Sequence, residues 1–299
     1  MEVVTAKFHT KCVNSEHQIF DCITKDMIAV SNTTCFKLDT FQNHQTGKTL
    51  EDRNQSKISF QGIYRDKIWG SDVLSGGGST VAYAVRATKV LSSVLAYIKK
   101  QFGLTRVKML DVPCGDMTWM QHFLKARDDI DYTGFDIVPE LIQVHKIKFK
   151  NYSEWSFQNH DIVENGLSSS FDLIFSRMML QHLHNDDVLT FLDAVSTSGS
   201  KFILTTSFPN THENIELQHV RGRFHSINLE IPPFSLPPPL CYSRDGPEEN
   251  NKHYLHLWRL PLQQVRNCSV AHRVPLKLSK TAMQYFSCFD GSFKQFQTI

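Results

Sequence analysis

Four aspartates stand at or just after short apolar runs of the sequence. Asp111 closes the run VKMLD, Asp116 follows in the next loop, Asp136 closes YTGFD, and Asp161 lies in NHDI. A carboxylate at the end of a strand can accept hydrogen bonds from both hydroxyls of a ribose, and Asp136 fits that role. Asp111 and Asp116 together would repel an anion and attract a cation. These residues therefore predict a ligand that carries a ribose and a positive charge.

The loop after the first of these runs reads PCGDM and contains a single glycine, Gly115. A glycine here permits a tight turn and a close approach of the backbone to a ligand. The pattern G-x-G-x-x-G, which leaves room for a pyrophosphate in nicotinamide dehydrogenases, is absent from this loop. A dehydrogenase is therefore disfavoured, whereas S-adenosylmethionine, with its sulfonium and amino groups, suits an acid-rich loop.

Repeated strand and helix patterns predict the elements that would position these residues. We expect strands at residues 107–112, 132–137, 155–157, 171–175 and 201–206, and helices at 118–125, from Pro139 onward and at 186–194. A further helix, capped by Ser79 or Thr80, is expected to bury one face formed by Val81, Ala84, Val85, Leu91, Val94, Leu95 and Ile98. Residues 253–260 are predicted to form a strand, in a hairpin with 240–242. Such alternation is typical of an α/β fold whose parallel sheet is covered by helices and binds ligands at the carboxyl ends of its strands.

The motif series resembles that of class I S-adenosylmethionine-dependent methyltransferases. The segments that carry the resemblance are DVPCGD, GFDI, HDI and DLIFSR. More narrowly, WGSDVLSGGGS, CGDMTWM and DLIFSRMMLQHL are similar to a small group with an SGxGS loop, a CGDxxWM motif and a His-Leu pair. The chain departs from the broad family at Pro113 and Met117, where glycines often stand. The resemblance covers roughly residues 69–262 and implies a Rossmann-like fold, a mostly parallel seven-stranded sheet, and S-adenosyl-L-methionine as the cofactor.

The resemblance also implies roles for individual residues of the cofactor site. Asp111 matches the acid that orients the methionine moiety through its amino group, and Asp136, followed by Ile137, matches the ribose-binding acid. Asp161 matches the acid that accepts from the adenine amino group, with Ile162 beside the ring. The remaining candidates are the turn Cys114, Gly115 and Asp116, and Ser176 in the segment Ser176–Met178, where methyl donor and acceptor meet. The loop Ser75–Ser79 either closes over the cofactor or is a plain linker.

The acceptor side is less defined by the sequence. Arg177 and His182 are the candidate catalytic residues, because an acceptor that must lose a proton needs a base nearby. His182 and His184 either contact substrate or have a structural role, and Arg177 pairs either with an acidic substrate or with Asp116. Trp119 either packs in the core or stacks on a ligand.

Composition and charge limit the remaining possibilities. The chain has 299 residues, 41% of them hydrophobic, and 32 Lys and Arg balance 30 Asp and Glu. This balance predicts no strong electrostatic attraction to nucleic acid or membranes. The seven cysteines are widely spaced and form no CxxC motif, which indicates no metal site. We expect a polar extension at 1–68, a methyltransferase domain at 69–262 and a tail at 263–299. A cytoplasmic enzyme acting on a small molecule or a protein is the leading hypothesis. A binding module without turnover, and a lumenal location, are the alternatives.

Overall fold

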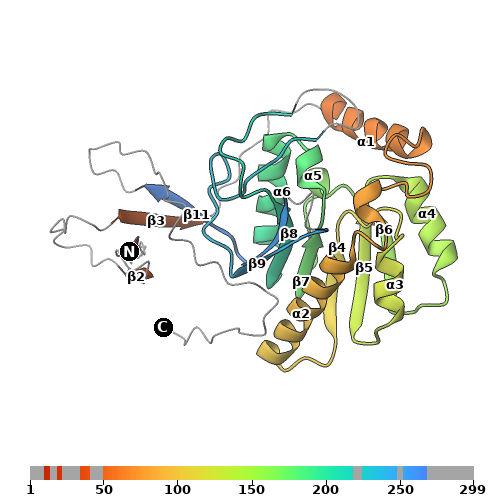
Figure 1. Cartoon of the computed structure of the whole chain (residues 1–299), viewed down its shortest axis with the longest axis horizontal. Helices are drawn as coiled ribbons and strands as arrows, with labels where there is room; N and C mark the ends of the chain where they lie inside the picture. The colour runs from red at the N-terminus through yellow and green to blue at the C-terminus, as the bar shows by residue number, and fades with distance from the viewer. Residues whose placement is uncertain are drawn as a thin grey trace, which may run out of the picture.

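The computed structural model describes residues 10–13, 19–21, 34–40, 50–217, 224–247 and 252–267. Within these residues, seven strands form the main sheet in the order β6-β5-β4-β7-β8-β10-β9 (Figure 1). Their bounds are β4 Val107–Asp111, β5 Ile130–Asp136, β6 Trp155–Asn159, β7 Leu173–Ser176, β8 Phe202–Ser207, β9 Cys241–Arg244 and β10 Tyr254–Arg259. Strands β4 to β8 pair in parallel, and β10 is antiparallel to both β8 and β9. This arrangement confirms the predicted α/β fold, and the predicted hairpin is present as β9 and β10.

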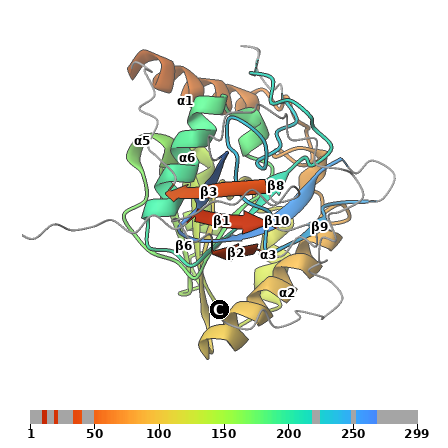
Figure 2. The ribbon, with the colours of Figure 1, turned by 90° about the vertical axis from the view of Figure 1, so that its left-hand side faces the viewer.

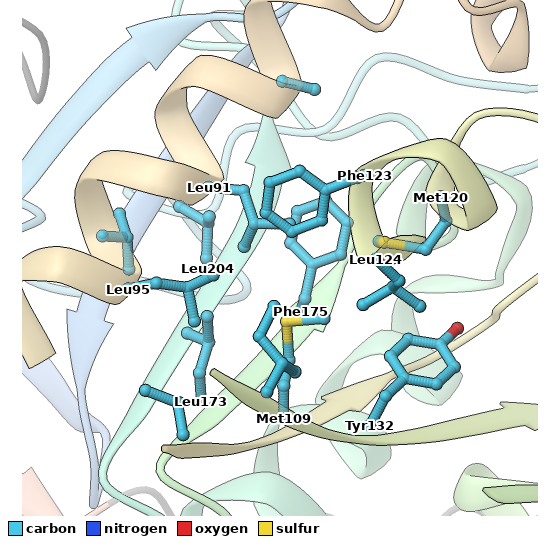
Figure 3. Packing of buried hydrophobic residues seen from close by; sticks show 14 of the residues in the cluster. Leu91, Leu95, Met109, Met120, Phe123, Leu124, Tyr132, Leu173, Phe175 and Leu204 are labelled. Atoms are coloured by element: carbon cyan, nitrogen blue, oxygen red, sulfur yellow. The ribbon is translucent and has the colours of Figure 1, made fainter. Parts of the chain in front are cut away.

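Helices cover both faces of this sheet. One hydrophobic cluster joins the sheet to α2 (Val85–Phe102), α3 (Met120–Lys125) and α4 (Pro139–Lys148). Figure 3 shows its centre, where Leu91 and Leu95 of α2 face Met109, Leu173 and Leu204 of the sheet. A second cluster on the opposite face joins the sheet to α5 (Ile162–Asn165), α6 (Asn185–Thr197) and the segment from Ile227 to Leu236. The order of the strands in the sheet reverses direction between β4 and β7. The loops that follow these central strands are therefore free to build a ligand site.

The start of α2 differs from the prediction. Val81 and Val85, predicted to be buried, are 49% and 47% exposed, because the helix begins only at Val85. The rest of the predicted face is buried: Ala84, Leu91, Val94, Leu95 and Ile98. The N-cap is Ala84, and no side chain caps the helix. Thr80 forms a side-chain hydrogen bond in the turn before the helix, where its Oγ1 accepts from the Tyr83 N–H. The helix ends at Gly103, which has a left-handed φ of 63°.

The described residues before position 69, where the sequence predicts a polar extension, form one helix and three short strands. Helix α1 (Leu50–Arg65) crosses the top of the molecule in Figure 1. A second, four-stranded sheet has the order β11-β3-β1-β2, with bounds Thr10–Val13 for β1, Ile19–Asp21 for β2, Thr34–Thr40 for β3 and Gln263–Asn267 for β11. Figure 2 shows β1, β2 and β3 side by side. Strand β11 begins the segment predicted as a tail, and it pairs with β3.

Candidate active site

One cavity of about 370 Å³ lies beyond the carboxyl ends of the central strands. Its volume falls in the range of roughly 300–1,000 Å³ that is usual for small-molecule sites. All but one of the predicted site residues line it: Asp111, Cys114, Gly115, Asp116, Asp136, Ile137, Asp161, Ile162, Arg177 and His182. Ser176 does not line it, because its side chain is buried within the sheet, where Ser176 is paired with Thr205 of β8.

The turn after β4 requires glycine at position 115. Gly115 has a φ of +55°, and a Cβ there would lie 2.5 Å from Ser75 Oγ. Its N–H donates to Asp136 Oδ2 at 3.0 Å, and its carbonyl accepts from His145 Nε2 at 2.6 Å. The turn is therefore fixed from three sides with its backbone against the cavity.

Asp136 organises the end of β5. Oδ2 accepts from Gly115, and Oδ1 accepts from the Val138 N–H at 3.0 Å. Burial raises the pKa of this carboxyl to about 6, although these backbone hydrogen bonds oppose the shift. Each carboxylate oxygen has two lone pairs, so both retain capacity for a ligand hydroxyl.

Asp111 has the most strongly shifted pKa of the acids that line the cavity. Its side chain is buried, and Oδ2 accepts from the Tyr132 hydroxyl at 2.8 Å. Burial raises its pKa to about 8, so the acid is mainly protonated at pH 7. The sequence predicts two negative charges at Asp111 and Asp116, but burial outweighs the Tyr132 hydrogen bond and the charge of Arg177, which both favour ionised Asp111. A bound cation would favour the ionised form further.

Asp161 is the N-cap of the short helix α5. Oδ1 accepts from the backbone N–H groups of Val163 and Glu164 at 3.0 and 3.2 Å. These two hydrogen bonds fix the carboxyl group and do not use its second oxygen. The Asp161 side chain is thus held at the cavity wall with one oxygen left for a ligand.

Asp116 fastens the Ser75–Ser79 loop to the turn. The Ser75 N–H donates to Asp116 Oδ2 at 2.9 Å, and the Asp116 N–H donates to Ser75 Oγ at 2.9 Å. Ser75 Oγ also forms a 2.9 Å hydrogen bond with the hydroxyl of Tyr64 from α1. Every residue of the loop lines the cavity, so the loop is a wall of the site.

Arg177 has a partner that neither predicted alternative named. Its Nε and Nη2 donate to the carboxylate of Asp245 at 2.8–3.0 Å. The two side chains are only 4% and 0% exposed, and the guanidinium lies over the ring of Trp119. Asp116 does not contact Arg177. Trp119 belongs to the core cluster, as one of its two suggested roles requires, and it also lines the cavity.

The two histidines after β7 have separate environments. His182, in the 3-10 helix Leu180–His182, lines the cavity with its ring centroid 4.8 Å from that of Trp69. His184 precedes α6 and pairs through Nδ1 with Glu216 Oε1 at 3.0 Å. His184 does not line the cavity, which leaves His182 as the candidate base.

Comparison with known proteins places this geometry in a family. A family model described as "Methyltransferase domain" matches residues 109–198, which carry Asp111, Asp136, Asp161 and Arg177. Malonyl-[acyl-carrier protein] O-methyltransferase from Paenibacillus sp. (strain JDR-2) is 26% identical over 133 residues, or 42% of this chain and 48% of that protein. The match thus spans about half the length of this curated relative. Residues 109–198 of this chain thus match a methyltransferase domain, and the comparisons support a class I S-adenosylmethionine-dependent methyltransferase.

A solved structure shares the fold of this part of the chain. N-methyltransferase NodS from Bradyrhizobium japonicum WM9, in complex with S-adenosylhomocysteine, has a TM-score of 0.50 at 15% identity and covers 68% of this chain and 98% of its own. The 1,6-didemethyltoxoflavin-N1-methyltransferase of Burkholderia thailandensis has a TM-score of 0.49 at 14% identity, with 79% and 98% covered. In the part of the chain that the structure describes, no helix has the length and apolar character to cross a membrane.

The cavity of the methyltransferase domain also uses residues that the sequence analysis missed. Phe60 and Tyr64 reach it from α1, in the segment assigned to the extension, and Phe224 reaches it from beyond β8. Asp245, which holds Arg177, was not proposed either. The sequence offered one signal for this part of the site, the Trp of the WGSDVLSGGGS motif. Trp69 connects α1 to His182, because its ring lies 5.9 Å from that of Tyr64 and 4.8 Å from that of His182.

Proposed function

We propose that this chain transfers a methyl group from S-adenosylmethionine to a small-molecule or protein acceptor. The observation that carries the proposal is the convergence of Asp111, Asp136 and Asp161, from the ends of three adjacent strands, on one cavity beside the Gly115 turn. A protein acceptor is within this range, because the curated relative is named for malonyl-[acyl-carrier protein].

The residues present fit this cofactor. Gly115 leaves space that a side chain would fill, and the three acids are suited to the polar groups of an adenosyl sulfonium. Asp111 would hold the amino group, Asp136 the ribose hydroxyls, and the second oxygen of Asp161 the adenine amino group. Ile137 and Ile162 would pack beside the adenosine. When bound, the cofactor supplies an electrophilic methyl group.

On the acceptor side, the proposed roles belong to His182 and Arg177. His182 would orient the acceptor or receive its proton, since it lines the cavity at the end of the 3-10 helix that follows β7. The Arg177 guanidinium, held by Asp245, would present its remaining Nη1 group as a fixed hydrogen-bond donor. A dry, aligned site contributes more to such a displacement than a strong base does.

S-adenosylhomocysteine should bind the full-length protein at one site. Isothermal titration with S-adenosylhomocysteine measures the stoichiometry directly, and a rise in melting temperature would accompany binding. The absence of both heat and thermal shift at millimolar ligand would refute the proposal. Transfer of radiolabelled methyl from S-adenosylmethionine to an acceptor then separates an enzyme from a binding module.

Affinity for S-adenosylhomocysteine should rise with pH between about 6 and 8. Its ammonium group favours ionised Asp111, whose pKa is about 8 in the ligand-free protein, so below that value binding must release a proton. Release of one proton changes affinity by about tenfold per pH unit. Titrations at several pH values should show this slope for the natural protein, and Asp111→Asn should bind weakly with a flat profile.

The matched control for this pH dependence is Asp129→Asn. Asp129 is paired with Lys99 and Arg127 and does not line the cavity. Its replacement should leave the slope unchanged. A natural protein with pH-independent affinity would show that Asp111 does not bind the ammonium group.

A further inference from the structure

Part of the cavity wall is a continuous series of aromatic rings. We call Phe60, Trp69, His182 and Phe224 the ring wall, and all four line the cavity. Successive ring centroids are 6.2 Å apart for Phe60 and Trp69, 4.8 Å for Trp69 and His182, and 6.4 Å for His182 and Phe224. Four separate segments of the chain converge to build this wall, which is not required for packing the sheet.

The ring wall begins beside the turn that would hold the cofactor. Trp69 Cβ lies 3.5 Å from the position of a Cβ on Gly76, in the loop that Ser75 and Asp116 fasten to Gly115. His182 continues the wall toward the end of β7, where Arg177 lies. The wall therefore borders the space between the cofactor turn and the candidate acceptor residues.

The charges near the ring wall oppose an anionic acceptor. Among the described residues that line the cavity, Arg177 is the only lysine or arginine, and the carboxylate of Asp245 compensates its charge. Asp187 also lines the cavity, as do the apolar side chains of Met179 and Leu183. Desolvating an anion against such a surface would be costly, whereas an aromatic face gains from contact with a flat or cationic group.

We infer that the acceptor is a small molecule that carries its accepting nitrogen or oxygen on a flat aromatic or heteroaromatic ring, uncharged or cationic, stacked against the ring wall. This inference rests on the proposed methyl transfer. The new bond joins the acceptor nitrogen or oxygen to the methyl carbon as the methyl–sulfur bond breaks. The acceptor's proton passes to His182 or water, and S-adenosylhomocysteine remains. Stacking would restrict the ring to the orientations from which in-line attack is possible.

Paired probes that differ only in aromaticity test this inference. The full-length protein, saturated with S-adenosylhomocysteine, is titrated with phenol and cyclohexanol and with aniline and cyclohexylamine, and binding is followed by saturation-transfer NMR. Malonate and a lysine peptide are tested alongside. With radiolabelled S-adenosylmethionine, the same compounds are tested as acceptors. We expect the aromatic member of each pair to bind more tightly and the methylated compounds to be aromatic.

Two variants with matched controls connect binding to the ring wall. Phe224→Leu, at a side chain that is 62% exposed, and Trp69→Leu should each weaken binding of the aromatic probes by about 2- to 10-fold. Phe102→Leu, at another exposed phenylalanine, and Trp155→Leu, in the ring stack with Tyr152, should change nothing. Phe224→Leu should also retain the natural affinity for S-adenosylhomocysteine.

Two kinds of failure are distinguishable. A natural protein that does not bind S-adenosylhomocysteine contradicts the proposed function itself. If it binds S-adenosylhomocysteine but does not prefer aromatic probes, or methylates malonate or the lysine peptide instead, the inference about the acceptor is wrong and the proposed function stands. Aromatic binding that is unchanged in both Phe224→Leu and Trp69→Leu would likewise overturn the role of the ring wall.

Discussion

Replacing Asp245 by alanine is expected to lower the free energy of unfolding by about 3–5 kcal/mol. The substitution removes one partner of a fully buried ion pair and leaves the guanidinium of Arg177 without its carboxylate. The remaining positive charge would be held near Trp119 in a place with little access to water. Chemical denaturation of the ligand-free protein measures this loss.

An exposed ion pair provides the control for this substitution. Asp131 pairs with Arg106 at 2.8 Å, but the two side chains are 46% and 36% exposed. Asp131→Ala should cost less than about 1 kcal/mol, because water screens and replaces the interaction. The double variant Arg177→Met, Asp245→Leu should recover much of the stability, since it removes both charges. Equal losses for Asp245→Ala and Asp131→Ala would contradict the buried pair.

Gly115→Ala should weaken binding of S-adenosylhomocysteine by at least about 100-fold. The added Cβ would lie 2.5 Å from Ser75 Oγ. The alanine would also have to adopt a φ of +55°, which is unfavourable for a residue with a Cβ. Either Ser75 moves, which breaks its hydrogen bonds with Asp116, or the turn moves and loses its hydrogen bond to Asp136. Both responses alter the cavity wall, so calorimetry should register little or no binding.

Gly103→Ala is the control that separates the backbone strain of a positive φ from the steric clash with Ser75. Gly103 has a similar φ of +63° at the end of α2, but nothing lies within 4 Å of a Cβ there. This variant should lose roughly 1 kcal/mol of stability and bind the ligand normally. Normal binding by Gly115→Ala would show that the turn is not part of the cofactor site.

The strand-end part of the site was predictable because its signals are local. Asp111, Asp136 and Asp161 each follow an apolar run, and parallel strands bring such ends to one edge of a sheet. Gly115 was recognisable for the same reason, since the turn lies immediately after β4. Ser176 was misplaced because successive side chains of a strand point to opposite faces of the sheet, and the cavity is lined by Phe175 while Ser176 is buried.

The contacts between distant segments were not predictable from sequence patterns. Asp245 lies 68 residues beyond Arg177, and only the β9–β10 hairpin brings the two together. Similarly, Tyr64 reaches Ser75 because α1 crosses over the site, and the polar composition of that helix gave no indication of burial at its end. Periodicity identifies elements, whereas these pairs depend on how complete elements are placed in three dimensions.

The pairing of β3 with β11 affects the order in which the protein can assemble. Thr40 pairs with Gln263, so this contact joins segments that lie on either side of the whole methyltransferase domain in the sequence. A ribosome must therefore release the entire domain before β3 can meet its partner. Because closing so long a loop in an unfolded chain is slow and entropically costly, we expect the domain to fold first and to bring the two strands together afterwards.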